Sequence, residues 1–542
     1  MKIARYFNTV KYLRFEQIFY RLKYRFRNIK LDSFSNVKRH DWCWQGLNVV
    51  DQSIISSSKV KFLNKIGRLE HASDWNSHEQ TKIWLYNLHY FDDLNSTNYQ
   101  IRENIHYDYI ERWIEQNQPC IGTGWEPYPL SLRLVNWVKW FSKKNYVEQK
   151  YLSSLAQQAE ALSQQLEYHI LGNHLFANAK ALIFAGCYLK GEEAKKHLKL
   201  GLKLLDREIS EQFLKDGAHF ELSPMYHCIV LWDLIELIHL GETSKNEYLI
   251  KRLSFWKNTA KKALFWLETM LHTDREVSFF NDSSIGISAS PDTLFSYAEK
   301  LGIETVFSDQ NLITNKASGY SKVCQGNYLL IFDHANVGPD YLPGHAHADT
   351  LSFEMSIGSQ RVFVNSGTSL YGLSEERLRQ RKTPAHNTVS VSSYDSSQVW
   401  SGFRVAKRAY AKLVKAVCED NRVELIASHN GYLQQKPKAI HARQLICEPE
   451  TIEIIDSISK LIESCFHLHL HPYVDVFEVN DKSINILFNN KCICNFTSSE
   501  SINIVDSTYH PEFGKSIPNK KIEIPFANGN LKTQINLISE PK

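Results

Sequence analysis

Apolar residues recur at intervals of three and four along most of residues 1–310. In LSLRLVNWVKWF, for example, Leu130, Leu134, Val135, Val138 and Phe141 mark one broad apolar face. This spacing matches the turn of an α-helix and predicts amphipathic helices. The predicted helices cover residues 101–116, 130–142, 151–170, 174–190, 193–211, 224–240 and 250–271. Short turns separate them, which favours antiparallel helix pairs stacked as a bundle, solenoid or toroid.

The pattern changes near residue 320, where apolar and polar residues begin to alternate. Short alternating runs with Gly, Asn, Asp and Pro between them predict an antiparallel β-sandwich. The runs are LLIFDHA, LSFEMSI, RVFVNSG, NTVSVSS, VELIAS, IEIIDSI and FHLHLHP. SIGSQRVFV reads as a hairpin that turns at Gly358-Ser359. We therefore expect an N-terminal arm at 1–40, a helical domain at 41–315 and a β-sandwich domain at 316–542.

Charge is distributed unevenly along the chain. The net charge is +4, but the first forty residues alone carry +9, which leaves −5 for the remainder. A body of this charge excludes a broadly basic nucleic-acid binder. The basic arm is interleaved with Tyr, Phe, Leu and Ile. It could form a helix at a membrane surface, or a helix that packs on the body and turns its charged face to water.

Cysteine usage and the apolar runs bear on the compartment. None of the ten cysteines forms a C-x-x-C pair, and several, such as Cys187 and Cys465, lie in apolar runs. They are typical of buried free thiols, which favours a reducing compartment. No secretory signal and no apolar stretch of membrane-spanning length is visible. We expect a cytoplasmic or inner-membrane-associated protein.

Polar and aromatic residues gather in six blocks, mostly at breaks between regular segments, where functional residues are often held. The blocks are GTGWEPYPLSLRLVNW, GNHLFANAKAL, DGAHFELSPMYH, FNDSSIG, PGHAHADTLSFE and RKTPAHNTVSV. In the fifth block, His345, His347 and Asp349 alternate, so on a strand they would share one face and could bind metal or catalyse. Asn365 and His386 could complete a zinc site with His347, although Asn is a poor ligand.

Two further blocks contain candidates with simpler explanations. Asn173 and His174 follow Gly172 before an apolar helix, where Asn173 could be a helix cap. Tyr226 follows Ser223-Pro224, and a lone tyrosine is usually a core residue. Ser223 lacks the G-x-S-x-G elbow of serine hydrolases, and Walker, dinucleotide-binding and H-E-x-x-H motifs are absent.

In these six ordered blocks, over roughly residues 80–460, the sequence resembles the heparinase II/III-like polysaccharide lyases, which include related alginate lyases. The resemblance implies an incomplete α/α toroid followed by an antiparallel β-sandwich. It implies that Asn173 and His174 engage a uronate carboxylate, that Tyr226 is the catalytic tyrosine and that His345 is the catalytic histidine. His347, Asn365 and His386 match a structural zinc site of some members, where Asn365 replaces the usual Asp. Zinc binding is therefore left open.

The implied reaction is β-elimination from a uronic-acid-containing, anionic polysaccharide. Donors aimed at the uronate carboxylate stabilise the charge that develops when the C5 proton leaves. A neighbouring cation would favour the Tyr226 phenolate as base. We expect the substrate groove to be lined by Trp125, Tyr128, Arg133, Glu221, Arg377, Arg381 and Arg404. A link to surface polysaccharide synthesis or turnover would fit the absence of an export signal.

Two other functions remain open from the sequence. A glycoside hydrolase on a similar toroid would use two carboxylates, for which Glu126, Asp216, Glu221 and Asp282 are available. A non-catalytic polysaccharide-binding or assembly factor would keep the fold and lose the catalytic set. The polymer, the choice between endo and exo cleavage and the oligomeric state are not predicted.

Overall fold

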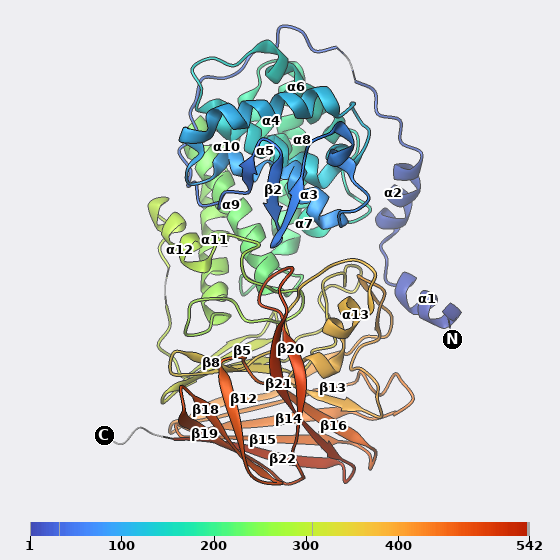
Figure 1. Ribbon diagram of the computed structural model, residues 1–542, viewed down its shortest axis with the longest axis vertical. Coiled ribbons are helices and arrows are strands. Elements are labelled where there is room, and N and C mark those ends of the chain that lie inside the picture. Colours follow the sequence, from blue (N-terminus) through green and yellow to red (C-terminus); the bar gives the residue numbers. More distant parts are fainter. Residues whose placement is uncertain (1, 32, 306, 539–542) are drawn as a thin grey trace.

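Helices form one end of the molecule and antiparallel sheets the other in the computed structural model, which describes residues 2–31, 33–305 and 307–538 (Figure 1). The helical part matches the apolar periodicity closely. Its helices are α3 (Lys82–Tyr90), α4 (Glu103–Gln116), α5 (Pro127–Ser142), α6 (Gln149–Ser163), α7 (Gly172–Tyr188), α8 (Glu192–Gln212), α9 (Pro224–Ser244), α10 (Glu247–Ile250), α11 (Leu253–Thr269) and α12 (Pro291–Lys300). The predicted helices are confirmed, except that the one expected to reach residue 170 ends at Ser163.

A small sheet in the helical part was not predicted. It consists of β1 (Ile54–Ser56), β2 (Lys59–Phe62) and β3 (Lys65–Arg68). Its strands are too short to show a clear alternation in sequence. The turn between β2 and β3 places Leu63 and Asn64 at φ 52° and 60°, the left-handed pair typical of a tight hairpin. This turn reaches the β part, where the Asn64 side-chain amide donates to the Phe513 carbonyl at 3.0 Å.

Helix α7 lies at the centre of the helical part, packed against α5, α6, α8 and α9. Every residue of α7 is buried except His174. This explains why its sequence has no polar face, since a helix covered on all sides needs none. Large aromatic side chains fill the surrounding core, including the fully buried Trp75, Trp113, Trp137 and Trp140.

Three antiparallel sheets form the β part. The eight-stranded sheet runs in the order β12 (Ala411–Glu419), β13 (Arg422–His429), β14 (His441–Cys447), β15 (Thr451–Ile458), β22 (Asn530–Leu537), β19 (Lys491–Ser498), β18 (Ser483–Phe488) and β17 (Val474–Asn480). The four-stranded sheet runs in the order β20 (Asn503–Tyr509), β21 (Ile517–Phe526), β16 (Ser464–His469) and β9 (Val389–Val391). The five-stranded sheet runs in the order β4 (Leu312–Asn315), β5 (Tyr320–Gln325), β6 (Tyr328–Asp333), β7 (Phe353–Ile357) and β8 (Gln360–Phe363). All three contribute to one apolar core. The predicted hairpin is confirmed, because Ile357 pairs with Gln360 around Gly358-Ser359.

The two parts are joined by a continuous interface. Trp266 and Phe280 of the helical part pack with Tyr320 and Ile331 of the five-stranded sheet. Loops on both sides meet beside this contact, together with the short helix α13 (Glu375–Arg381) and the bridge between β10 (Val399–Trp400) and β11 (Arg404–Val405). The polar residues of the six sequence blocks converge largely on this junction.

Two helices precede the helical part, α1 (Lys2–Val10) and α2 (Phe15–Arg25), and both lie along one flank of the molecule (Figure 1). No helix among the described residues is long and apolar enough to cross a membrane. The ten cysteines are all unpaired, and Cys43 and Cys418 are exposed rather than buried.

Candidate active site

Helix α9 begins at the junction and positions Tyr226 there. Ser223 caps the helix, since its Oγ accepts a hydrogen bond from the Tyr226 backbone N–H at 3.2 Å, and Pro224 occupies the first helical position. The Ser223 hydroxyl also donates to the backbone carbonyl of Asp282 at 2.5 Å. The start of α9 is therefore tied to the loop that carries Asp282.

The rings of Tyr226 and His345 meet at the junction although they come from different parts of the chain. Their centroids lie 3.8 Å apart. Tyr226 is 8% exposed, and its hydroxyl is 3.0 Å from the hydroxyl of Tyr371. Burial, together with the neighbouring Tyr371, raises the pKa of Tyr226 well above its ordinary value. Burial and the Tyr371 hydroxyl thus favour the protonated phenol here, whereas the sequence interpretation had a neighbouring cation favouring the phenolate.

Asp282 is the centre of the hydrogen bonds that hold His345. The fully buried carboxylate accepts from His345 Nδ1 at 2.9 Å, from His347 Nε2 at 2.8 Å and from the guanidinium of Arg377. Burial opposes its ionisation, but the charge of Arg377 and the two imidazole bonds keep the pKa of Asp282 well below its usual range. An ionised Asp282 directs Nδ1–H of His345 toward itself and leaves Nε2 on the opposite side of the ring, near Glu221.

Asn173 and His174 approach from the opposite side at the start of α7. The Asn173 backbone N–H donates to Glu221 Oε1 at 3.2 Å, and Glu221 Oε2 lies 3.5 Å from His345 Nε2. Gly172 makes this approach possible, because a Cβ there would lie 2.6 Å from Glu221 Oε1 and its φ is +60°. Burial raises the pKa of Glu221. Glu221 therefore links the α7 terminus to the Tyr226–His345 pair.

His174 is held by Glu167 and Tyr128. Its Nδ1 lies 3.0 Å from Glu167 Oε1, and its ring centroid is 4.3 Å from that of the half-buried Tyr128. Burial opposes protonation, but Glu167 outweighs it and raises the pKa of His174. The helix N-terminus and a His174 that readily becomes cationic together favour an anionic group at this position.

Not every predicted groove residue reaches the junction surface. Trp125 is buried beside Trp113, with its indole N–H bonded to the Asn117 carbonyl at 3.3 Å. Arg133 is completely buried in the helical core, where it bonds to Gln158 at 2.8 Å. The sequence suggested a groove because both lie in a polar block, but both side chains face the core, so this prediction is wrong for them.

The three predicted arginines of the β part have different environments. Arg377 is buried and paired with Asp282, and Arg381 is buried with its guanidinium on the Ala346 carbonyl at 2.9 Å. Burial and the nearby Arg377 lower the pKa of Arg381 to about 9. Both position loops of the site and do not line an open groove. Arg404 is exposed over the ring of Trp400.

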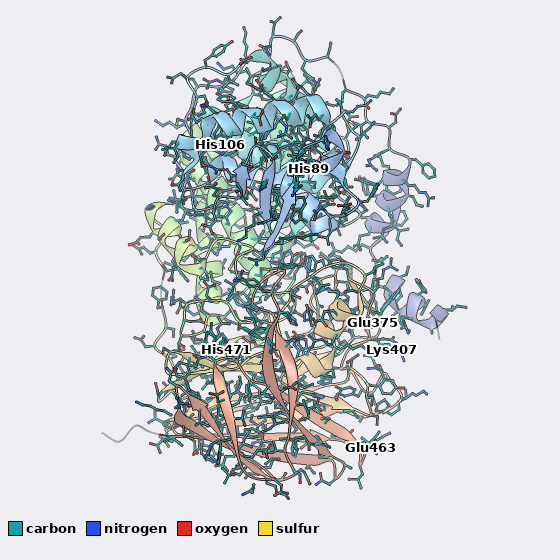
Figure 2. All side chains as sticks on the ribbon, viewed as in Figure 1. His89, His106, Glu375, Lys407, Glu463 and His471 are labelled. Atoms are coloured by element: carbon teal, nitrogen blue, oxygen red, sulfur yellow. The ribbon has the colours of Figure 1, made fainter. Side chains whose placement is uncertain are left out.

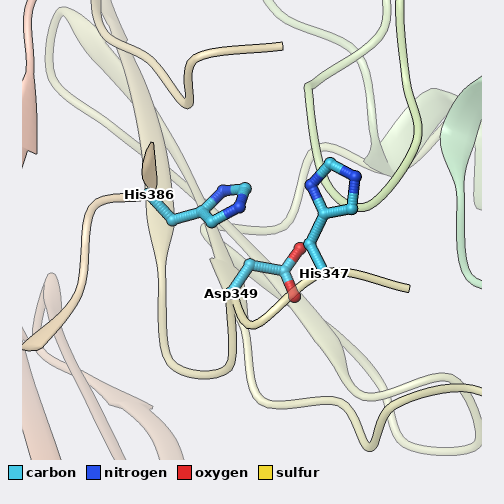
Figure 3. A group of neighbouring side chains, drawn as sticks. All are labelled: His347, Asp349 and His386. Atoms are coloured by element: carbon cyan, nitrogen blue, oxygen red, sulfur yellow. The ribbon is translucent and has the colours of Figure 1, made fainter. Parts of the chain in front are cut away.

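Residues 343–352 of the fifth sequence block form a loop between β6 and β7, so His345, His347 and Asp349 do not lie on a strand. The side chains therefore do not share one face. His345 turns toward Tyr226, whereas His347 and Asp349 lie near His386, with possible ligand atoms within 4.8 Å of one another (Figure 3). Asp349 thus occupies the place that the sequence suggested for Asn365.

His347, Asp349 and His386 could together bind a metal ion, because several of their ring nitrogens have no hydrogen-bond partner. Nδ1 of His347 and both ring nitrogens of His386 are buried without a hydrogen-bond partner. Such atoms are costly unless they have a partner, and two imidazoles with a carboxylate are a usual ligand set for zinc. The other nitrogen of His347 is bonded to Asp282, as the second nitrogen of a metal-binding histidine commonly is. Asn365 instead accepts from the Asn387 backbone at 3.1 Å, while its amide nitrogen has no partner.

Two buried histidines of the helical part are bonded to neighbouring groups of the core, although Nδ1 of His106 has no partner. In the helical part, His89 bonds to the Trp75 carbonyl at 2.9 Å and to the Trp113 indole at 3.0 Å (Figure 2). Burial lowers the pKa of His89 to about 3. His106 likewise bonds to Asp93 at 2.8 Å. These histidines stabilise the fold, in contrast to His345 and His386.

Two residues of the site were not singled out from the sequence for the roles they occupy. Tyr371, which bonds to the Tyr226 hydroxyl, lies outside all six blocks, and no sequence signal marks it. Asp282 lies in FNDSSIG, but it was considered only as a carboxylate for a hydrolase. An acidic residue in a polar block that also contains Asn and Ser was the sequence signal for it.

Family models match nearly the whole chain. The model of the heparinase II/III N-terminus matches residues 14–313, and the model of the heparinase II/III-like C-terminal region matches residues 310–538. The chain is 26% identical over 378 residues to a heparin-sulfate lyase of Bacteroides thetaiotaomicron, covering 59% of this chain and 51% of that protein. It is 37% identical over 267 residues to a heparin-sulfate lyase of Pedobacter heparinus, covering 45% and 39%. The chain thus spans about half or less of the length of these relatives.

Solved structures share the fold. A crystal structure of heparinase III has a TM-score of 0.69 at 17% identity, covering 97% of this chain and 90% of that chain. A heparan sulfate lyase from Pedobacter heparinus has a TM-score of 0.60 at 17% identity, covering 97% and 88%. The chain therefore has the mixed helical and antiparallel β fold of these proteins, and, by the family models that match it, it belongs to the heparinase II/III-like family.

Proposed function

We propose that this protein is a polysaccharide lyase that cleaves a uronic-acid-containing polymer by β-elimination. The observation that carries the proposal is the contact between the rings of Tyr226 and His345, 3.8 Å apart and contributed by different parts of the molecule. Relatives named as heparin-sulfate lyases make a glycosaminoglycan-like polymer the first substrate to test.

The geometry supports a division of labour between the two rings. His345 acts as the base that removes the C5 proton, because Asp282 holds its Nδ1–H and leaves Nε2 to accept a proton. Asp282 then stabilises the imidazolium that forms. Tyr226, whose raised pKa keeps it protonated, donates its proton to the oxygen of the departing 4-linked sugar. A positioned acid or base of this kind contributes about 100- to 10,000-fold to the rate.

The start of α7 supplies the site for the uronate carboxylate. The Asn173 amide and a cationic His174 would donate to the carboxylate as it takes on aci-carboxylate character in the transition state. Glu167 supports this role because it raises the pKa of His174. The half-buried Tyr128 beside His174 provides a ring against which the sugar can stack.

The hydrolase alternative is disfavoured by the bonds of its candidate carboxylates. Asp282 is paired with Arg377 and two histidines. Asp216 accepts from the backbone and hydroxyl of Ser318 at 2.8 and 3.0 Å. Glu126 accepts from Lys82 and from the Tyr86 hydroxyl. Of the four candidates this leaves only Glu221, so a pair of carboxylates free to serve as acid and nucleophile is not supported among them.

We also propose that His347, Asp349 and His386 hold a structural zinc ion. The unpaired imidazole nitrogens support this assignment, and Asp349 supplies the carboxylate that Asn365 lacks. Zinc at such a site contributes folding energy by fixing its ligands together. The chain's own residues carry the elimination, and zinc would fix the loop that carries His345.

The finer architecture belongs to the same proposal. The helical part, 41–315, is an incomplete α/α toroid, the β part, 316–542, is a sandwich, and 1–40 is an arm. The shared core of the three sheets supports a sandwich. A role in making or turning over a surface polysaccharide, inside the cell or at the inner membrane, remains part of this hypothesis, and cell fractionation tests it.

The deciding experiment compares wild-type protein with Tyr226→Phe on a panel of uronate polymers. Elimination creates a conjugated 4,5-unsaturated uronate that absorbs ultraviolet light, whereas hydrolysis does not. We expect Tyr226→Phe to lower the rate at least about a hundredfold. The exposed Tyr473→Phe is the matched control and should keep full activity. Chain shortening without new absorbance, or full activity in Tyr226→Phe, would refute the proposal.

A further inference from the structure

Helices α1 and α2 turn their apolar faces outward, away from the protein. On α2, Phe15, Ile18, Phe19, Leu22 and Phe26 follow the spacing of one helical stripe, and all are exposed. Phe15 and Phe26 are each 81% exposed. On α1, the side chains Ile3, Phe7 and Val10 repeat the pattern. We call these eight side chains the outer stripe.

The inner faces of the two helices are polar or carry hydroxyls, and they hold the helices in place. On α1, Thr9 accepts from the Trp400 indole at 3.1 Å, and Arg408 lies 3.7 Å from the ring centroid of Tyr12 just beyond the helix. On α2, the Tyr20 ring stacks on Tyr168 at 4.4 Å, and the buried Gln17 donates to the Tyr341 carbonyl at 3.1 Å.

The orientation is therefore fixed by specific contacts with both parts of the molecule. It is the reverse of the sequence interpretation in which the arm packs its apolar face on the body and shows charge to water. Helix α1 contacts the β part and α2 contacts the helical part, so the outer stripe runs along one flank of both (Figure 1).

Positive charge borders the outer stripe. Exposed cations lie along α2 and beside both helices, namely Lys11, Arg21, Lys23, Arg25 and Arg27. An exposed apolar patch with a polar rim marks an interaction surface. A basic amphipathic helix with Phe and Leu on its apolar face is typical of segments that lie in the plane of a membrane interface.

We propose that the outer stripe binds the surface of a lipid bilayer that contains anionic lipids. A bilayer offers both an apolar layer for the Phe, Leu and Ile side chains and negative headgroups for the cations. An anionic polysaccharide would match the charge but leave the apolar stripe uncovered. A second copy would cover the apolar stripe but bring two basic arms together, with repulsion between like charges. In this orientation both helices and the long axis of the protein lie parallel to the bilayer surface.

Vesicle flotation of the full chain tests the proposal with neutral phosphatidylcholine vesicles and with vesicles that also contain phosphatidylglycerol. Wild-type protein should bind the anionic vesicles, less at high salt. The triple variant Phe7→Ser, Phe15→Ser, Phe19→Ser should lose binding at least tenfold. Neutralising Arg21, Lys23 and Arg25 to Gln should lower binding to anionic vesicles about a hundredfold, since each cation near such a surface contributes roughly 1 kcal/mol.

The matched control is Leu461→Ser with Phe477→Ser, two exposed apolar residues of the β part. This control should bind vesicles like the wild type, and all variants should keep the near-ultraviolet circular dichroism of the folded protein. Failure of the wild type to bind anionic vesicles overturns the proposal, as does unchanged binding by the triple variant. Loss of a dimer, or of polysaccharide binding, in the triple variant without any vesicle binding would identify the other partner and equally overturn it.

Discussion

Two clusters of polar side chains in this protein contain the same residue types but differ in their hydrogen bonding. At the junction, Asp282 holds His345, His347 and Arg377. In the eight-stranded sheet, Asp456 holds His441 at 2.7 Å and Arg443 at 2.8 Å, and His441 also contacts His429 at 3.2 Å. Each cluster thus combines an aspartate, an arginine and two histidines.

The two clusters differ in how many of their polar side-chain atoms have hydrogen-bond partners. The sheet cluster comes from neighbouring strands of one sheet, and Arg443 also donates to the Leu351 and Asn387 carbonyls. The junction cluster draws on a loop of the helical part, a loop of the β part and α13. It leaves Nδ1 of His347 unpaired, and Nε2 of His345 has the Glu221 carboxyl 3.5 Å away as its neighbour. A cluster that stabilises the fold is internally complete, whereas one prepared for chemistry keeps atoms available.

The largest expected difference is between Asp282→Asn and Asp456→Asn. Each leaves a buried arginine without its counter-charge and should destabilise the protein by about 3–5 kcal/mol. Only Asp282→Asn should also lower kcat of the folded protein, by about ten-thousandfold, because His345 loses its orientation. Thermal unfolding and the absorbance assay measure the two effects. Equal kcat in the two variants would show that the clusters do not differ in function.

Removing one imidazole from each cluster sharpens the comparison. His345→Ala should lower kcat about 100- to 10,000-fold with little change in stability, because the ring is partly exposed. His441→Ala should instead cost about 2–5 kcal/mol of stability through the cavity it leaves and keep the wild-type kcat. An active His345→Ala variant would assign the base to another group.

Zinc should stabilise the molecule only through the junction. At a hundred times its dissociation constant, zinc should raise the free energy of unfolding by about 2.7 kcal/mol. Asp349→Asn and His386→Ala should each abolish this shift. Calorimetry and metal analysis of the purified protein are the measurements. A shift that persists in both ligand variants would place zinc elsewhere.

The smallest effect concerns acid. Burial opposes ionisation of Asp456, but Arg443 and His441 keep its pKa below the ordinary value. Its contribution to stability is therefore present above the unfolded-state pKa of about 4 and is lost as the pH falls through the folded-state value. The unfolding free energy of Asp456→Asn should depend less steeply on pH below about 4 than that of the wild type, as measured by denaturant titration.

The sequence predicted the elements with strong periodicity and missed those that depend on tertiary contacts. Helices such as α5 and α8 follow from apolar spacing alone. The alternation of His345, His347 and Asp349 would place them on one face of a strand, but 343–352 form a loop, and only the fold brings His345 and His347 to Asp282. Arg133 was placed in a groove because a polar residue in a polar block does not reveal its burial. Tyr371 could not be found, since only folding brings it to Tyr226.

The outer stripe shows the same limit. Periodicity predicted amphipathic helices in the arm but not which face would turn outward. The face that turns outward depends on contacts with residues such as Trp400 and Tyr168, which lie far from the arm in the sequence. Amphipathicity alone therefore does not show whether a helix packs its apolar face on the protein or exposes it to a partner.

Under the proposed mechanism, the contact of Tyr226 with His345 makes activity depend on the helical part and the β part together. Neither part holds a complete proton-transfer pair by itself. A chain divided between α12 and β4 should thus give two inactive fragments whose mixture regains turnover only as they reassociate. The turnover of the mixture would then measure what fraction of the two fragments has reassociated correctly.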